Sequence, residues 1–511
     1  MQWARGLLIV LSLAFSACRQ YAADPGGRTF SANVPITWDE QALATLEVPL
    51  PNAQFSPKAV PREYYYRIPV RPIYRSYPVY APDKEPPGYF ESLKQREPET
   101  LWDDKRRQPR LASEADWGKA GEIVFNAPIF YDQVTTVANV RNPEWYAKVR
   151  PPVTKEGILP YMSYVIRDKG KIELGNNGCA FCHTRVLPDG TVIPGAQGNF
   201  PFDRALGFTM RRVPLRAARA GFRTLYGAPW LKDQDPAARA DSLSMDEIVG
   251  KLQAIPGGVV ARHRASPDAP PAVPDLIGVR DRKYLDKSGL VLHRGIGDLM
   301  RYAALNNELD FLSSFGDFIP AGRNYRALPE PTDPNLPGGG RYSDEQLYAL
   351  ALYVYSLKPP NNPNERTDDA VRGEAVFRRE GCVRCHTPPL YTNNRLTPAL
   401  GFTVPEEHRT RYAITSTVVG TNPTLTLKTR RGTGYYKVPS LKGLWYRGPI
   451  EHNGSVATLE DWFDPRRLRD DYVPTGFMPY GVKARAVQGH EFGLSLSDED
   501  KKALIAFLKT L

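Results

Sequence analysis

Two short stretches of this 511-residue chain combine cysteine and histidine in the same spacing. Residues 179–183 read CAFCH and residues 382–386 read CVRCH, so both have the form Cys-x-x-Cys-His. Two cysteines on one turn can bond both vinyl groups of one porphyrin, and the adjacent histidine then reaches the iron. A zinc site would need two more ligands near each pair, and a redox dithiol does not require the histidine. The spacing therefore predicts two covalently bound haems c, attached through Cys179 and Cys182 (haem 1) and through Cys382 and Cys385 (haem 2).

Each motif supplies one axial iron ligand, His183 for haem 1 and His386 for haem 2. The opposite ligand decides the chemistry, because a second strong ligand produces an electron relay whereas an open position can bind peroxide or dioxygen. Any single remaining histidine or methionine is more often structural than a ligand. The candidates are His263, His293, His408, His452 and His490, with Met162, Met210, Met245, Met300 and Met478.

Internal repeats indicate which elements hold the motifs. Residues 121–125 (GEIVF) resemble 373–377 (GEAVF), and each stretch precedes one motif. Residues 343–357 (SDEQLYALALYVYSL) align without a gap with 497–511 (SDEDKKALIAFLKTL). Both begin with a serine N-cap and continue with apolar residues at helical spacing. The pattern predicts two haem modules, each closed by an amphipathic helix and joined by a Pro/Asn linker at 359–364.

We therefore expect a mainly α-helical fold of two cytochrome c-like modules, 111–360 and 365–511, with long irregular Pro-rich connections. The chain has 48 prolines, and residues 18–110 are rich in Pro, Tyr and Arg. Closely spaced prolines exclude long helices and central strands. These residues are expected to form an extended arm laid over the modules; a disordered tether is the alternative, but the many tyrosines favour docking.

The first residues are typical of export. Arg5 and the apolar run 6–15 (GLLIVLSLAF) are followed by small residues and Cys18, which predicts a secretory signal over 1–17. Residues 15–18 (FSAC) also resemble the lipobox of bacterial lipoproteins, which implies that Cys18 is lipidated. An ordinary signal peptide cut nearby is the alternative. We expect the protein on the periplasmic side or in the cell envelope, anchored to a membrane surface through Cys18.

The charge balance is basic, with a formal net charge of +11. The arginines are scattered, and there is neither a dense Lys/Arg block nor a nucleic-acid motif, so no nucleic-acid partner is expected. A small redox protein that donates or accepts electrons is the expected partner. An acidic partner would suit the charge, but the sequence does not determine one.

Residues 372–511 resemble the C-terminal half of bacterial di-haem cytochrome c peroxidases and MauG-type enzymes. The matching stretches, in order, are 373–386 (GEAVFRREGCVRCH), 436–441 (YKVPSL) and 452–459 (HNGSVATL). This chain departs from the pattern of the peroxidases at two places. The peroxidases place a methionine ligand about fourteen residues past the histidine of His-Asn-Gly-Ser, where this chain has Arg466. They also carry a distal histidine on a loop near the first haem, and the stretch around Asn199 has none.

A subgroup, the rubber-oxygenase-like di-haem cytochromes, is similar in the interval between motifs. Its C-terminal Gly-His-Glu-Phe-Gly supplies the distal histidine of the second haem, and this chain has that string at 489–493. The resemblance implies that His386 and His490 bind the haem 2 iron. Met478 is the rival ligand, because 476–479 (GFMP) resembles the Met-Pro loop of small cytochromes c. We interpret His452 as a structural or inter-haem histidine whose imidazole bonds to the backbone.

For haem 1 the resemblance implies an open or labile distal side, with His183 as the proximal ligand of the active haem. Residues 274–280 (PDLIGVR) and 289–306 (GLVLHRGIGDLMRYAALN) could wall that pocket. His293 is the first histidine candidate if the site is closed. Arg294 is a candidate polar group above a bound oxygen species.

The resemblance implies an oxidoreductase of the peroxidase/MauG superfamily. Haem 2 would pass electrons from a small donor to haem 1, which would react with peroxide or dioxygen. Two alternatives stay open at this point. One is a pure electron-transfer cytochrome with both irons six-coordinate, and the other is a lipid-anchored oxygenase acting on an apolar polymer or a small organic molecule.

Overall fold

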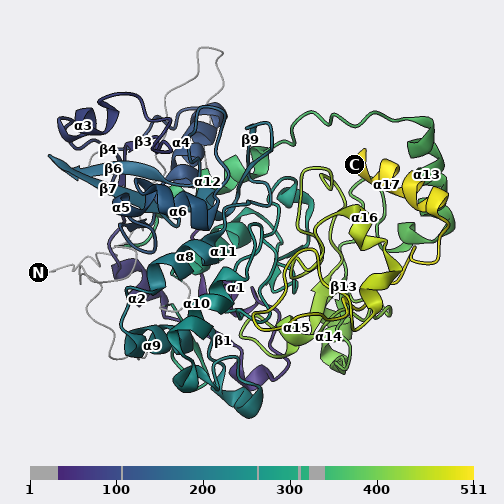
Figure 1. The fold of residues 1–511 in the computed structure, drawn as a ribbon. Helices are drawn as coiled ribbons and strands as arrows, with labels where there is room; N and C mark the ends of the chain where they lie inside the picture. Colours follow the sequence, from purple (N-terminus) through teal and green to yellow (C-terminus); the bar gives the residue numbers. More distant parts are fainter. Residues whose placement is uncertain (1–32, 105–106, 262–263, 309–311, 321–339) are drawn as a thin grey trace, which may run out of the picture.

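A computed structural model describes residues 33–104, 107–261, 264–308, 312–320 and 340–511 (Figure 1). The expected signal peptide, Cys18 and His263 lie outside the described residues, so export and lipidation stay predictions. Among the described residues, none of the helices combines the length and apolar character that crossing a bilayer demands.

Two pairs of helices form the framework around the motifs. Helix α4 (Glu114–Asn126) packs against α12 (Asp344–Ser356), and α13 (Asp368–Arg379) packs against α17 (Asp498–Lys509). The two closing helices begin where the repeat predicts: the side chains of Ser343 and Ser497 accept hydrogen bonds from backbone N–H groups in the first turns of α12 and α17. These caps satisfy backbone donors that have no partner inside the helix.

Equivalent glycines let each pair approach closely. A Cβ atom placed on Gly121 would overlap the carbonyl oxygen of Ala349 and lie 2.6 Å from the Cβ of Tyr353. A Cβ on Gly373 would overlap the carbonyl oxygen of Ala503 in the same way. The internal repeat in the sequence therefore corresponds to the same helix–helix contact in both modules. In each, a glycine without a side chain sets the distance between the two helices.

The two modules differ in how the chain travels from the first helix of the pair to the motif. In the second module α13 leads at once through Gly381, which has φ +72°, into the short 3-10 turn Cys382–Arg384. In the first module an insert separates α4 from the motif helix α7 (Cys179–Cys182). The insert contains β5 (Phe130–Tyr131), α5 (Val137–Val140), α6 (Pro143–Val149), β6 (Ser163–Asp168) and β7 (Lys171–Asn176).

Three strands of the insert join β3 (Ser76–Tyr77) in an antiparallel sheet, and the chain then returns to α4. The strand order is β3-β6-β7-β5, and β7 ends two residues before the motif. A Cβ on Gly178 would overlap the carbonyl oxygen of Ala127, the residue that follows α4. Because of this close approach, α7 contacts α4 just as the second motif contacts α13, despite the insert.

The expectation of a mainly α-helical fold is therefore correct only in part. Helices make up about 35% and strands about 12% of the structure, so the fold is mixed. Figure 1 shows the four-stranded sheet at one end of the molecule and α13 and α17 at the other. The strands come largely from the N-terminal residues and from the insert, where β-branched and aromatic residues pack on one face of the sheet.

Residues 33–104 lie against the first helix pair. Trp38 stacks on Tyr65 with ring centroids 4.1 Å apart and donates from Nε1 to the Val60 carbonyl at 2.8 Å. The hydroxyl of Tyr66 donates to the carboxylate of Asp344 at the start of α12. The elements of this region are α1 (Glu40–Ala44), β1 (Pro57–Ala59), α2 (Arg62–Arg67), β2 (Ile73–Tyr74), β3 (Ser76–Tyr77), α3 (Tyr89–Lys94) and β4 (Thr100–Trp102).

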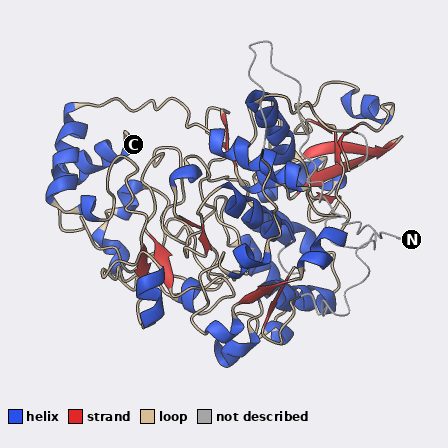
Figure 2. Cartoon of the chain, turned by 180° about the vertical axis from the view of Figure 1, so that it is seen from behind, coloured by secondary structure: helices blue, strands red, loops and turns tan. Residues whose placement is uncertain are grey.

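The remaining elements surround the two motifs and are seen from behind in Figure 2. Between the first motif and α12 lie β8 (Thr184–Val186), β9 (Val192–Pro194), α8 (Phe202–Met210), α9 (Leu215–Tyr226), α10 (Met245–Gln253), β10 (Tyr284–Leu285), β11 (Val291–Leu292), α11 (Ile296–Glu308) and β12 (Ser313–Phe315). After the second motif come β13 (Leu396–Pro398), α14 (Glu406–Arg411), α15 (Thr424–Leu427), β14 (Tyr435–Lys437) and α16 (Leu459–Trp462). Strand β1 pairs with β12, and β13 pairs with β14.

The glycine contact gives a stability prediction with a matched control in the same helix. Gly121→Ala should destabilise the fold by about 1–3 kcal/mol, because the new methyl group meets backbone of α12. Gly118→Ala adds a methyl group that meets nothing within 4 Å, and should stabilise α4 by up to about 1 kcal/mol. Urea unfolding followed by circular dichroism measures both changes. Equal effects of the two variants would contradict the proposed close contact.

Candidate functional site

Each Cys-x-x-Cys-His motif closes a single turn that places its three functional side chains together. The backbone N–H of His183 donates to the Cys179 carbonyl at 2.9 Å, and that of His386 donates to the Cys382 carbonyl at 2.8 Å. Burial raises the pKa of the Cys179 thiol to about 12 and that of Cys382 to about 11. These thiols are therefore protonated at neutral pH, unlike the low-pKa thiolates of redox dithiols.

A distant backbone carbonyl orients the imidazole of each motif. His183 Nδ1 lies 3.1 Å from the Pro274 carbonyl oxygen, and His386 Nδ1 lies 3.2 Å from the carbonyl oxygens of Tyr391 and Pro439. A carbonyl can only accept, so Nδ1 carries the proton and Nε2 keeps its lone pair for a metal. Burial lowers the pKa of His183 to about 4, which keeps the ring neutral. Both rings are held in the form that an iron ligand requires.

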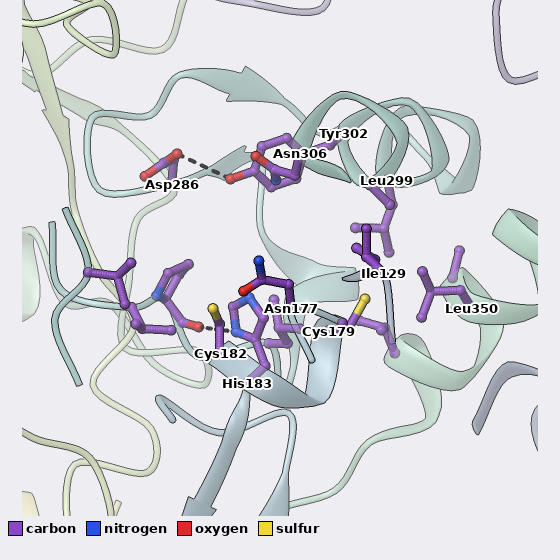
Figure 3. Close-up of a pocket in the computed structure, with 18 of the residues that line it drawn as sticks. Ile129, Asn177, Cys179, Cys182, His183, Asp286, Leu299, Tyr302, Asn306 and Leu350 are labelled. Atoms are coloured by element: carbon purple, nitrogen blue, oxygen red, sulfur yellow. Dashed lines mark hydrogen bonds between the residues drawn. The ribbon is translucent and has the colours of Figure 1, made fainter. Parts of the chain in front are cut away.

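A cavity opens above the first motif (Figure 3). The part of this cavity that can hold water-sized molecules is about 140 Å³, and the cavity is partly open to solvent. Most of the wall is apolar. The lining residues used below are Cys179, Cys182 and His183 on one side, with Asp286, Tyr302, Asn306 and Arg431 among the polar groups.

Two helices present one face each to this cavity. Helix α11 contributes Leu299, Tyr302, Ala303 and Asn306, and α12 contributes Leu347, Leu350, Ala351 and Val354. Both sets follow the spacing i, i+3, i+4, i+7, which places the four side chains of a helix on a single face. The α11 face is the more informative, because two of its four positions are polar.

The polar groups of the cavity are joined by hydrogen bonds opposite the motif. The Tyr302 hydroxyl donates to Asp286 Oδ2 at 3.1 Å, and Arg431 Nη2 donates to the Tyr302 oxygen at 3.3 Å. Arg431 also forms an ion pair with Asp286 Oδ2. Figure 3 shows Asp286 and Tyr302 across the cavity from Cys182 and His183. Burial raises the pKa of Tyr302 to about 12, so the phenol keeps its proton.

The loop that carries Asp286 is fixed from both sides. Asp286 is 1% exposed, has φ +71°, and follows β10 in a tight connection to β11. Its Oδ1 accepts from the backbone N–H of Lys287 at 2.7 Å. The hydroxyl of Ser288 donates to the Arg431 carbonyl at 2.9 Å, and the hydroxyl of Thr433 donates to the Ser288 carbonyl at 2.7 Å. Residues from the second module thus hold the loop of the first.

The sequence identified the walls of this cavity but not its polar groups. Segments 274–280 and 289–306 do contribute to the lining, so this expectation is confirmed. The expectations for His293 and Arg294 are wrong. His293 bonds through Nδ1 to the Arg282 carbonyl at 2.7 Å and through Nε2 to the Tyr355 hydroxyl at 2.6 Å, outside the lining. Arg294 is committed to an ion pair with Asp298, also outside the lining.

At the second motif the structure brings His386 and His490 together. Their ring centroids are 6.2 Å apart. Two imidazoles that bind one metal from opposite sides, each at about 2.0 Å, have ring centres about 6 Å apart. The separation of these two rings therefore fits a single iron between them. Burial lowers the pKa of His490 to about 4, so this ring is neutral as well.

The loop of His490 is held by a buried arginine. Arg467 is fully buried and donates to the carbonyl oxygens of Val487, Gly489 and His490 at 2.6–2.9 Å. The N–H of His490 donates to the Val419 carbonyl at 2.6 Å, and the residue has φ +48°. The rival ligand Met478 is partly buried. The structure shows His490 facing His386, and the choice between His490 and Met478 as an iron ligand stays a prediction.

Two further sequence expectations are resolved at this site. His452 Nδ1 contacts the carboxylate of Glu451, and its ring lies 4.5 Å from the Tyr436 ring; the expected bond from this imidazole to the backbone is wrong. Arg466, at the position where the peroxidases have methionine, pairs with Asp464 on the surface and is 77% exposed. In the part of the chain that the structure describes, no three His, Cys, Asp or Glu side chains gather to hold a metal ion, so the ligands of a zinc site do not assemble there.

The comparisons with known proteins relate part of the chain to cytochrome-c peroxidases. No family model matches. The cytochrome-c peroxidase IdrP2 of Denitromonas iodatirespirans is 27% identical over 186 residues, covering 31% of this chain and 46% of the relative. The IdrP2 of Pseudomonas sp. (strain SCT) is 26% identical over 190 residues, covering 32% and 47%. The chain thus spans about half the length of the curated relatives it matches.

Two solved structures resemble the chain weakly. Hydrazine synthase of Kuenenia stuttgartiensis has 15% identity and a TM-score of 0.29, over 58% of this chain and 87% of that chain. A MauG-like protein associated with microbial copper homeostasis has 18% identity and a TM-score of 0.22, over 33% and 56%. These scores are too low to relate the folds.

Proposed function

We propose that the chain is a di-haem c-type oxidoreductase that reacts with peroxide or dioxygen at the first motif and relays electrons through the second. One observation carries this proposal, the unequal surroundings of the two motif histidines. His386 faces His490 at the separation expected for one shared iron. His183 faces a cavity whose described lining includes no other histidine and no methionine. The similarity to cytochrome-c peroxidases supports this assignment.

When bound, haem c supplies an iron that exchanges single electrons and can bind a small oxidant at an open position. The residues of this chain prepare the two sites for different tasks. His490 and His386 close the second site from both sides. At the first site the apolar side chains that α11 and α12 present to the cavity would limit the access of water, and the Pro274 carbonyl holds His183 with its Nε2 lone pair available to an iron.

The two motif histidines are joined through the protein. Covalent segments alternate with four hydrogen bonds, so that a continuous bonded route joins the two sites. From the second motif to the first, the bonds are His386 Nδ1 to Pro439 O (3.2 Å), Arg447 Nη2 to Ser440 O (2.8 Å), Tyr446 Oη to Asp275 Oδ2 (3.1 Å) and His183 Nδ1 to Pro274 O (3.1 Å).

The electron donor, the location and the anchor are part of the proposal as well. A small redox protein would deliver electrons to the second haem. Export to the periplasmic side or cell envelope and attachment through a lipid on Cys18 are supported only by the sequence of the first residues.

The number of haems follows from the two separate motifs. Replacing Cys179 and Cys182 together by alanine should remove one covalently attached haem, and replacing Cys382 and Cys385 together should remove the other. Mass spectrometry of the purified protein counts the attached haems in each case. A wild-type mass with one haem or none would refute the di-haem proposal.

The open position at the first haem is tested by the spectrum of the oxidised protein. We expect one high-spin component that shifts when cyanide or peroxide is added, and one low-spin component that does not. Two low-spin haems that ignore both ligands at every redox level would instead support a pure electron-transfer cytochrome.

The second ligand of the relay haem is tested by substitution. His490→Ala should convert the low-spin component into a high-spin one, because the iron loses one of two imidazoles. Met478→Leu, in the neighbouring loop, is the control and should leave the spectrum unchanged. The reverse pattern would transfer the ligand role to Met478.

A further inference from the structure

We infer that four cations between the two motifs form one site for carboxylate groups, and that its ligands are the propionate side chains of both haems. The four residues, which we name the inter-module cluster, are Arg282, Lys287, Lys437 and Arg447. The inference deepens the proposed function and rests on one part of it, the two bound haems, but not on the reaction with peroxide or dioxygen. Neither the sequence motifs nor the relatives assign a role to the cluster.

Arg282 lies on the side of the cluster that belongs to the first motif. His183 Nδ1 donates to the Pro274 carbonyl at 3.1 Å. The next residue, Asp275, forms an ion pair with Arg282 at 3.8 Å, and its side chain is only 2% exposed. Arg282 Nη2 also donates to the Ile277 carbonyl at 2.6 Å. The guanidinium group is therefore fixed beside the backbone that orients His183.

Arg447 has the equivalent place at the second motif. His386 Nδ1 donates to the Pro439 carbonyl at 3.2 Å. The carbonyl of the next residue, Ser440, accepts from Arg447 Nη2 at 2.8 Å. Burial lowers the pKa of His386, and the positive charge of Arg447 lowers it further, so the guanidinium group lies close to this ring. Within the described residues the buried Nε–H of Arg447 has no hydrogen-bond acceptor, which a bound carboxylate would supply.

The two lysines connect the two sides of the cluster. The backbone N–H of Lys437, in β14, donates to the Lys287 carbonyl at 3.0 Å, and both side chains are partly buried. Lys287 directly follows Asp286 of the first cavity. Lys437 lines a narrow cleft together with Arg282 and Ser440. The cluster therefore spans the boundary between the modules.

The cluster holds more positive charge than the surrounding protein neutralises. Burial and the guanidinium groups of the cluster lower the pKa of Lys287 to about 8. Burial and the other three cations lower the pKa of Lys437 well below its usual range. Among the described residues, the carboxylates that oppose the effect on Lys287 are Asp275 and Glu451, and Glu451 already contacts His452. Four cations thus face two carboxylates, and further anionic partners would restore the balance.

The haems themselves carry the anions that fit this site. Their propionate side chains are carboxylates at neutral pH, and each porphyrin would be tied to the chain by its thioether bonds. A tethered group has a high effective concentration, which favours it over a free anion from solution. Guanidinium groups bind carboxylates through paired hydrogen bonds, and lysines add positive charge. One cluster beside both motif histidines would therefore influence both haems.

The test measures the reduction potentials of both haems in the holoprotein by a spectroscopic redox titration. Ferric haem carries one more positive charge than ferrous haem, so cations at the propionates favour reduction. The double variant Lys287→Gln/Lys437→Gln should lower both potentials. The expected change in the ratio of reduced to oxidised haem is about tenfold, or about 59 mV for a one-electron couple.

Two further double variants control for charge and for packing. Lys283→Gln/Lys442→Gln removes the same charge from exposed positions in the same two segments, and both potentials should stay at the wild-type values. Lys287→Arg/Lys437→Arg keeps the charge of the cluster and should hold both potentials near those of the wild type. The attached haems are counted by mass spectrometry in every variant.

Each outcome decides the inference. Equal potentials in Lys287→Gln/Lys437→Gln and in Lys283→Gln/Lys442→Gln would refute the site and leave the buried lysines a packing role. Wild-type potentials that follow the phosphate concentration at constant ionic strength would also refute it, because the cluster would then bind a free anion. A fall confined to the variant that loses the buried charges, with both haems attached, supports it. If that variant does not fold, the single variants Lys437→Gln and Lys442→Gln decide by the same comparison.

These outcomes are distinct from those of the proposed function. A wild-type protein without attached haem refutes both. Two low-spin haems that ignore cyanide and peroxide refute the proposed reaction, whereas the comparison of potentials still decides the role of the cluster.

Discussion

The hydrogen bond from each motif histidine to a distant carbonyl is the constraint on which the rest of the structure depends. A Cys-x-x-Cys-His turn can form locally, but its imidazole has a useful direction only when Nδ1 has an acceptor. Pro274 supplies that acceptor 91 residues after His183, and His386 has two acceptors, Tyr391 five residues on and Pro439 53 residues on. The long connection of the first module must therefore return to its motif, and that of the second module does so as well. This requirement explains how large irregular segments coexist with two fixed histidines.

The paired helices also help to fix the position of each motif. Gly121 and Gly373 let α4 and α13 contact the backbone of the closing helices, which fixes the place where each motif turn is built. The first module tolerates an insert with three strands between helix and motif, because Gly178 brings the chain back onto the end of α4. Insertions are accommodated where the chain leaves and re-enters the framework at neighbouring points.

The sequence predicts three features: the motifs, the capped closing helices and the repeated glycine. Each can be predicted because it depends on residues that lie within a few turns of one another. The sequence also singled out His490 as a candidate ligand, because residues 489–493 match a five-residue string of a known group of cytochromes. The strand pairings were missed because they join segments far apart, such as β3 with β6. Tyr302, Asp286 and Arg431 come from three separate segments, so no spacing along the chain could join them. The only local signal was the polar pair Tyr302 and Asn306 on an otherwise apolar face of α11.

The failed expectation for His293 shows what decides between a structural and a functional polar group. His293 lies in the segment that walls the cavity, yet both of its ring nitrogens are satisfied by protein groups outside the lining. Tyr302 lies on the following helix and lines the cavity, where its hydroxyl donates to Asp286 and accepts from Arg431 of the second module. A residue type alone therefore does not identify a group that lines the cavity. The deciding property is whether the fold places the side chain in the lining, and for Tyr302 this depends on partners from separate segments of the chain.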